Sequence, residues 1–495
     1  MNCMITMEDL PFSATRREDD IIEPDRERNK QQWYSRKSYF GAVCFNIATY
    51  LIPAIYSTLS KLWIAKINAD SVATTDAYTY MGVIVEIWNE GLPRASYLVI
   101  GDVTLPGNVR LNALHTLIGF QAMGGLILSL LFLILAPHFA NTFVPEETVI
   151  QSINYIRISS FSTFFNVIDF TLGIGLRALD RPDVPLVISL SKTVANIVLD
   201  FLFLSTFRVT ESVNVETQAA TRLVCDFCGS VAGITYYFTT VKLKPKLKVA
   251  SLKSLIVPGM YTFAETLLRN GLYLWLVAGI VSLGANYATA WGVFNTIRWG
   301  AVMVLTNALY DAACAFTGHQ WSVSKPKDDR SCLTWNDVMH ITKYSRASAA
   351  IALIFEIILA ITFSFWLVEP FAYFLSESLE VAALVKMMWI SIDWTYILFS
   401  ISTQLSAILL STLPVFFFIK SLLGNLLWVL PWSIALSTLS ISAEEAWQYY
   451  AIIFGGSLVI GFIMQLISLG GWVYFNMKRK QFGKILQRFR ISIFD

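Results

Sequence analysis

Several ionisable side chains lie inside long apolar stretches of this sequence, where an isolated charge is costly. Glu265 and Arg269 are four residues apart, so a helix would place them on one face, where they could also form a plain ion pair. Asp393 has no basic residue within a helical turn, so its partner must be another segment, water or a ligand. A carboxylate in such a place can bind a proton or a cation and release it when its surroundings change. We therefore predict that Glu265, Arg269 and Asp393 take part in ion coupling or substrate binding.

A second set of candidates lies nearer the amino terminus. Glu86, Asn89 and Glu90 would share one helix face, because residues three and four apart are neighbours on a helix. Arg94 follows Glu90 by four residues, so a structural ion pair is the alternative interpretation. The last candidates are polar side chains in other apolar stretches: Asp169, Asn196 and Asn425.

The composition explains why such residues stand out. The chain has 495 residues, of which 55% are hydrophobic and 15% charged, whereas about 25% of residues are charged in an ordinary soluble domain. Its mean hydropathy is +0.56. These values exclude a disordered chain, a soluble nucleic-acid-binding protein and a disulfide scaffold. The four histidines have no metal-binding spacing, so we expect neither a metal site nor a cofactor.

Twelve apolar runs are long enough to cross a bilayer, which takes about 20 residues per helix. The runs do not alternate polar and apolar residues as the strands of a membrane barrel do. The sequence therefore predicts an all-α polytopic membrane protein. The twelve predicted helices cover residues 37–62, 77–100, 112–137, 151–176, 184–206, 221–241, 254–281, 286–316, 341–368, 382–411, 413–437 and 447–475.

The charges of the loops predict the orientation, because Lys and Arg collect on the cytoplasmic side of a membrane. Basic residues are common before the first helix, in every second loop and after the last helix, while the intervening loops are mostly acidic. We therefore expect both termini in the cytoplasm. The segment before the first helix has mixed charges and no apolar core of a signal peptide, so it is expected to be a soluble tail.

A lysine-rich stretch divides the chain into two halves of nearly equal length. Asn196 follows Pro185 at the same spacing as Asn425 follows Pro414, with a lysine in between, in corresponding helices of the two halves. This repeat favours two pseudo-symmetric six-helix lobes. The predicted organisation is a soluble tail (1–36), a first lobe (37–243), a basic linker (244–253), a second lobe (254–477) and a basic tail (478–495).

A second repeated pattern suggests a gate. The segment from Ala95 to Gly101 in the second helix resembles that from Ala312 to Gly318 in the eighth. This alignment places Arg94 and Asp311 at matching positions near the cytoplasmic ends of their helices. Opposite charges related by the pseudo-symmetry axis can pair when the cytoplasmic side closes. We predict that Arg94 and Asp311 form a cytoplasmic gate, and that exchanging the two charges rescues transport lost in the single variants.

The sequence resembles the multidrug and toxic-compound extrusion (MATE) transporters over roughly residues 45–475. The segment from Gly175 to Pro182 is similar to an arginine-containing turn of that family. The segment from Asn196 to Asp200 is similar to its Asn-x-x-x-Asp motif. Glu265 and Asp393 match acidic positions that several members use to bind a proton or a cation.

The resemblance implies a twelve-helix antiporter whose central cavity opens alternately to each side of the membrane. Influx of protons or Na+ would drive export of an amphipathic or cationic compound. Asn46 occupies a position that is acidic in some prokaryotic members. We expect the lipid bilayer and a small-molecule substrate as partners, no nucleic acid, and a monomer in the plasma membrane or the vacuolar membrane.

Other functions remain as alternatives. A flippase for a lipid-linked saccharide belongs to the same superfamily, but such proteins tend to have a more basic cavity, and the candidates here are mainly acidic. A membrane-embedded enzyme would need a nucleophile or a His–acid constellation at depth, and the sequence offers neither. We therefore expect a transporter and not an enzyme.

Overall fold

A computed structural model describes residues 34–35, 37–65, 71–203, 214–240, 249–325, 332–438 and 443–489. The predicted all-α fold is confirmed, because these residues form helices joined by short loops and no strand. Most of the predicted tail 1–36, the first half of the predicted linker 244–253 and the last residues of the chain lie outside the described residues.

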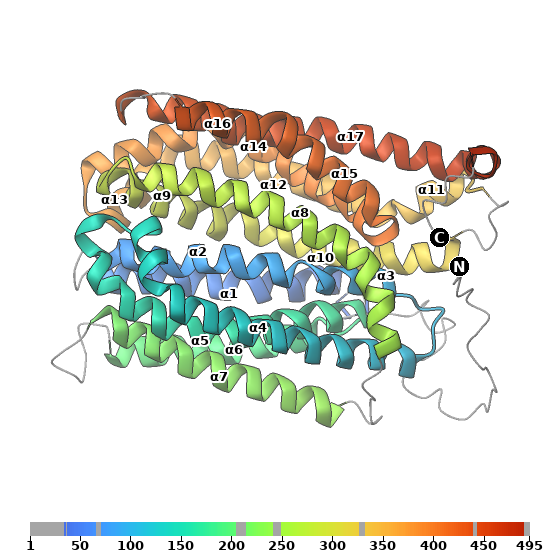
Figure 1. The fold of residues 1–495 in the computed structure, drawn as a ribbon, viewed down its shortest axis with the longest axis horizontal. Helices are drawn as coiled ribbons and strands as arrows, with labels where there is room; N and C mark the ends of the chain where they lie inside the picture. The colour runs from blue at the N-terminus through green and yellow to red at the C-terminus, as the bar shows by residue number, and fades with distance from the viewer. Residues whose placement is uncertain are drawn as a thin grey trace.

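The first half of the chain forms a continuous set of helices (Figure 1). Its elements are α1 (Tyr39–Ala65), α2 (Ser71–Asn89), η2 (Leu92–Ala95), α3 (Ser96–Val99), α4 (Gly107–Phe143), η3 (Glu146–Thr148), α5 (Val149–Ala178), α6 (Asp183–Phe203) and α7 (Val215–Thr240).

The second half of the chain is also helical, with more interruptions. Its elements are α8 (Val249–Val281), α9 (Ala285–Ile297), η4 (Arg298–Val302), α10 (Met303–Ser324), α11 (Trp335–Ile341), α12 (Lys343–Thr362), η5 (Phe363–Leu367), α13 (Val368–Ser376), α14 (Leu379–Thr412), α15 (Pro414–Gly424), η6 (Asn425–Val429), α16 (Leu430–Thr438) and α17 (Ala443–Phe489). The short elements η4, η5 and η6 are single π-helical turns inside longer helices.

Each of the twelve predicted spans coincides with one long helix or with two or three consecutive helices, apart from a few residues at the ends. Eight of these helical segments, among the described residues, are long and apolar enough to span a membrane by length and composition. The outer surface is also apolar: Met123 is 70% exposed, Ile134 72% and Phe365 76%. Such surfaces are stable in lipid, and the chain is an integral membrane protein.

Two apolar clusters join the halves of the chain at opposite ends of the helix bundle. We call the end at which α1 begins the near end, and the other the far end. The near cluster includes Tyr97 and Leu114 of the first half and Trp472 of the second. The far cluster includes Met81 of the first half and Trp291 of the second. Both ends of the bundle are therefore packed across the interface between the halves, along which α8 and α10 lie (Figure 1).

Gly318 lets α10 approach α3 closely at the near end. A Cβ atom at Gly318 would lie 2.6 Å from the backbone oxygen of Tyr97, which a side-chain rotation cannot relieve. We expect Gly318→Ala to lower the free energy of unfolding by about 1–3 kcal/mol, measured as thermal unfolding in detergent. Gly470→Ala is the matched control, because no atom lies within 4 Å of its added Cβ. Equal melting temperatures in the two variants would contradict this account.

Candidate functional site

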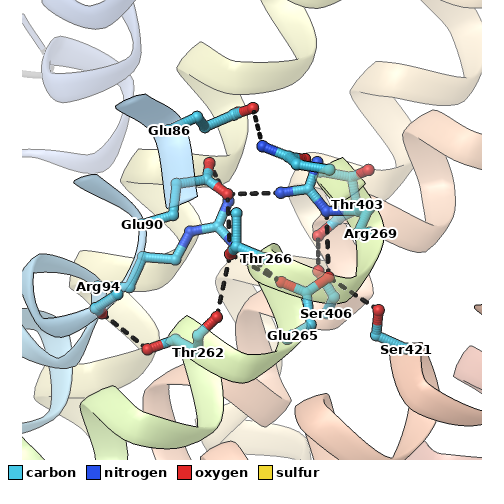
Figure 2. A network of polar contacts seen from close by, with 12 residues as sticks. Glu86, Glu90, Arg94, Thr262, Glu265, Thr266, Arg269, Thr403, Ser406 and Ser421 are labelled. Carbon is cyan, nitrogen blue, oxygen red and sulfur yellow. Dashed lines mark hydrogen bonds and ion pairs between the residues drawn. The ribbon is translucent and has the colours of Figure 1, made fainter. Parts of the chain in front are cut away.

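A network of ion pairs crosses the interface between the halves midway along the bundle (Figure 2). Glu90, at the end of α2, receives a hydrogen bond from Arg94 of η2. The same carboxylate pairs with Arg269 of α8, whose Nη2 lies 2.6 Å from Glu90 Oε2. Glu90 therefore joins a base from each half of the chain.

Glu265 is the most enclosed member of this network. It is 3% exposed, and its Oε1 accepts a hydrogen bond of 3.1 Å from Arg269 Nε. Its Oε2 lies 3.7 Å from Arg94 Nη1. Ser421 of α15 donates a further hydrogen bond of 2.8 Å, and Asn425 in turn donates to Ser421 at 3.1 Å. The predicted i,i+4 pair of Glu265 and Arg269 thus forms part of a larger charge cluster.

Glu86, Asn89 and Glu90, which the sequence predicts to share one helix face, contact two different neighbouring helices. Glu86 accepts a hydrogen bond of 2.8 Å from Asn270 of α8 and lies on the same side as Glu90. Asn89 donates instead to Asn166 of α5 at 3.0 Å, inside the first half. Glu86 and Glu90 therefore belong to the network between the halves, and Asn89 does not.

A second polar site is a cavity of about 370 Å³ inside the first half. It is lined by residues of α1, α2, α5, α6 and α7. Lys192 of α6 lies between two carboxylates, with its Nζ 2.6 Å from Asp226 Oδ1 and 3.4 Å from Asp169 Oδ2. Ser230 donates a hydrogen bond of 2.7 Å to Asp169. The predicted candidate Asp169 therefore lines this cavity.

Asp200 lies directly behind the cavity wall, one helical turn after Asn196. Its Oδ2 accepts hydrogen bonds from Tyr56 at 2.8 Å and from Ser60 at 3.2 Å. Asp200 is fully buried, and its Oδ1 has no hydrogen-bond partner among the described residues. The Oδ1 atom of Asn196, a cavity-lining residue, is also buried without a partner. These two oxygens offer unused acceptor positions next to the cavity.

The charges around the cavity do not balance. Lys61 pairs with Asp76 at 2.7 Å. Arg222 contacts the ring of Tyr78, 4.2 Å from the centroid, and the hydroxyl of Tyr155 at 3.1 Å. Among the described residues, five carboxylates and four bases either line the cavity or form a direct hydrogen bond or ion pair with a lining residue, so the carboxylates outnumber the bases by one. The bases are Lys61, Arg177, Lys192 and Arg222, and the carboxylates are Asp76, Asp169, Asp200, Asp226 and Asp311.

Arg177 and Asp311 form an ion pair between the halves. Arg177 Nη1 of α5 lies 3.4 Å from Asp311 Oδ2 of α10, and both residues are buried. Tyr97 donates a hydrogen bond of 3.0 Å to Asp311, and Tyr50 donates another. Arg177 also donates to Asn46 at 3.1 Å. We call this pair with its tyrosines the near-end latch.

The predicted gate pair is not formed in this structure. Arg94 pairs with Glu90 and Glu265, while Asp311 pairs with Arg177. Arg94 and Asp311 nevertheless both lie at the interface between the halves. The gate between them therefore stays a prediction, whereas the latch supplies a partner that the sequence alignment did not suggest.

Two further polar contacts cross the interface at the near end. Lys325 Nζ lies 2.6 Å from Asp102 Oδ2, and His319 Nδ1 lies 3.5 Å from Asp180 Oδ1. Although burial would raise the pKa of Asp102, hydrogen bonds from Lys325 and Thr104 hold that pKa below its usual value. The loop carboxylate therefore stays ionised and keeps its bond to the end of α10.

The chain matches one family model and several solved structures. Residues 111–202 match the MatE family model. A structure described as an outward-facing multidrug resistance MATE family transporter of the MOP superfamily matches with a TM-score of 0.68 and 16% identity, over 88% of this chain and 96% of that one. A MOP superfamily transporter from Pyrococcus furiosus matches with a TM-score of 0.69 and 16% identity, over the same shares of the two chains. No curated protein sequence matches.

The chain has the MATE fold. A Vibrio cholerae MATE transporter variant also matches, with a TM-score of 0.69 and 15% identity over 88% of this chain and 96% of that one. The resemblance predicted from the sequence is thereby confirmed. The matched structures are described as transporters.

Within this MATE fold, Asp393 lies apart from the other candidates. It is half-buried on α14 and accepts a hydrogen bond from Ser364 of η5. In the part of the chain that the structure describes, no contact joins it to the network around Glu265. A role for Asp393 therefore stays a prediction.

The sequence does not single out four residues that the MATE fold places at the cavity or beside it. Asp226 and Arg222 lie on α7, Lys61 on α1, and Lys192 on α6. Lys192 belongs to the repeated pattern that begins at Pro185, and this repeat is the sequence feature by which Lys192 could have been identified. Arg222 and Asp226 are four residues apart on α7 and so share a face of that helix, but only the packing of α1, α6 and α7 shows that this face and Lys61 meet in a common space.

Proposed function

We propose that the protein is a secondary active antiporter that exports an amphipathic or cationic small molecule. Influx of protons or Na+ drives the export by alternating access. The MATE fold supports this class of transport, and the excess of one carboxylate around the first-half cavity carries the coupling part of the proposal.

The cavity is suited to bind one monovalent cation at a time. A buried carboxylate without a compensating charge is costly, so the site gains free energy when a proton or cation neutralises it. Asp200 is the favoured position, because Tyr56 and Ser60 orient one of its oxygens while the other has no partner. Asn196 adds a second free oxygen nearby.

The network between the halves is suited to the substrate and to the conformational change. Glu86 is bound there by the neutral amide of Asn270, so it can accept a positively charged group. Glu90 and Glu265 share Arg94 and Arg269 as ion-pair partners across the interface. Separation of the halves must therefore break or rearrange these pairs.

The remaining features of the proposal follow the charge pattern of the sequence. We place both termini in the cytoplasm, and the protein in the plasma membrane or the vacuolar membrane. We propose that it works as a monomer without a cofactor, with the transported ion as the energy source.

The test is transport in proteoliposomes with an imposed pH or Na+ gradient and a fluorescent organic cation as probe. We expect Asp200→Asn to lower gradient-driven transport about tenfold, the size of a moderate coupling free energy. Glu147→Gln, an exposed loop variant, should leave transport unchanged. Unaltered gradient-driven transport in Asp200→Asn would refute the coupling role. Absence of transport under both gradients in the unmodified protein would refute antiport itself.

A further inference from the structure

Glu356 lies in the second half, away from both sites described above. It is on α12 and is 2% exposed, between α10 and α14. Ser400 of α14 donates a hydrogen bond of 2.9 Å to Glu356 Oε1, and Thr306 of α10 donates one of 3.3 Å to the same oxygen. In the described part of the chain, no basic side chain lies within ion-pair distance of Glu356. Glu356 thus differs from Glu265 in having only neutral partners.

A carboxylate in this position must be neutralised for much of its lifetime. An isolated buried charge costs several kcal/mol or more, and two hydroxyl bonds do not offset that cost. Both hydroxyls converge on Oε1, which leaves Oε2 available to carry a proton. Thr306 and Ser400 are also 2.9 Å apart, and either can be the donor. Since hydroxyls rotate, the cluster can stabilise either the charged or the neutral carboxyl.

Gln404 provides an independent observation that polar groups of this cluster are available to a further partner. It lies one helical turn after Ser400 on α14 and is fully buried. Its Nε2 donates a hydrogen bond of 3.0 Å to the backbone oxygen of Thr306, while its Oε1 has no hydrogen-bond partner within the part of the chain that the structure describes. A buried amide oxygen without a partner is rare in folded proteins.

The backbone near Glu356 is irregular on two of the three helices. Thr306 follows the π turn η4 by about one helical turn, and η5 begins two turns after Glu356. Single π turns inside helices are frequent at functional sites, because they change the hydrogen-bonding of the backbone locally. Among the titratable groups on the packed helices, the phenol of Tyr396 on α14 interacts with Glu356. The hydrogen-bond partners of Glu356, Thr306 on α10 and Ser400 on α14, are neutral hydroxyls.

We propose that Glu356 is a proton-binding site of the second half, separate from the first-half cavity. Its occupancy is transmitted through α10 to the interface between the halves. Beyond Thr306, the same helix presents the backbone oxygen of Ala308 to Asn46, and then Asp311 to the near-end latch. A rearrangement at Thr306 therefore reaches two contacts with the first half within two turns of one helix. The transport consequence of this site rests on the proposed function, whereas proton binding itself does not.

The direct test is infrared spectroscopy of the purified full-length protein in lipid, titrated with acid and base. A protonated buried carboxyl has a C=O band of its own, so the spectrum of Glu356→Gln subtracted from that of the unmodified protein isolates this group. We expect a band that disappears as pH rises and returns as pH falls. A band that persists at every pH would identify a permanently protonated structural acid and overturn the proposal. Absence of the band at every pH would overturn it too.

Ser400→Ala keeps the test decisive if Glu356→Gln fails to fold. This variant removes one donor to the charged carboxyl, so the band should disappear at a pH about one unit higher. An unchanged midpoint would contradict the role of the hydroxyl cluster. Glu147→Gln is the control and should leave the band and its midpoint unaltered.

A transport measurement then tests the link to the interface. Glu356→Gln should lower pH-driven transport about tenfold, with Na+-driven transport assayed alongside. If the infrared band titrates but transport is unaffected, the link through α10 is wrong. If the unmodified protein transports under neither gradient, the proposed function fails while the spectroscopic result on Glu356 stands.

Discussion

Lys192→Met is expected to lower the free energy of unfolding by about 3–5 kcal/mol and to abolish gradient-driven transport. The Lys192 ammonium lies 2.6 Å from Asp226 and 3.4 Å from Asp169. Asp226 is 1% exposed, so removal of the lysine leaves two carboxylates together in a place that water does not reach freely. The loss is measured as thermal unfolding in detergent, followed by intrinsic fluorescence.

The double variant Lys192→Met with Asp226→Asn separates stability from transport. It leaves Asp169 with its hydrogen bond from Ser230, so most of the stability should return. Transport should not return, because Asp169 in the cavity then lacks the Lys192 ammonium beside it. Lys386→Met is the matched control, since its ion pair with Glu369 has side chains 45% and 51% exposed and contributes little. Equal destabilisation in Lys192→Met and Lys386→Met would refute the argument.

Arg177→Met is expected to open the near end of the bundle. The variant leaves Asp311 buried with two tyrosine donors and no base, which favours conformations in which water reaches the carboxylate. Cys314 is a natural reporter, because it lies on α10 within a turn of Asp311 and is fully buried. In a variant with Cys314 as its single cysteine, we expect its labelling by a thiol reagent to accelerate about tenfold or more.

Charge exchanges identify the true partner of Asp311. Arg177→Asp combined with Asp311→Arg should restore the slow labelling, because the pair is re-formed with the same two side-chain types. Arg94→Asp combined with Asp311→Arg tests the gate predicted from the sequence repeat. If the Arg94 exchange restores transport and the Arg177 exchange restores nothing, the near-end latch is not the contact that closes this end.

The helices of this fold could be predicted from the sequence because each apolar run is long and bounded by charged loops. The π turns could not: η5 contains neither glycine nor proline, and the single glycines Gly300 in η4 and Gly424 before η6 do not distinguish a π turn from a regular helix. The ends of the helices shifted by several residues for a similar reason. Polar turns such as the first residues of α2 and α7 extend beyond the apolar core that marks a span.

The candidate residues also differ in how far the sequence predicts their contacts. Pairs within one helix, such as Glu265 with Arg269, follow from spacing alone. Pairs between helices do not, and Lys192 with Asp226 depends on the packing of α6 against α7. Glu356 is an acid in the middle of an apolar span, and the sequence indicates only that it must be shielded. The structure shows that neutral hydroxyl groups on α10 and α14 shield the carboxyl group, and it thereby identifies Glu356 as a specific candidate site.

The two apolar clusters at the ends of the bundle bear on the energetics of the proposed cycle. Separation at the near end exposes one cluster to water while the other holds the halves together as a hinge, and separation at the far end reverses these roles. Each open state therefore loses the apolar contacts of one cluster and keeps those of the other. The relative populations of the two states depend on the difference between these two costs. Where that difference is a few kcal/mol, binding of a single ion is enough to reverse which state predominates.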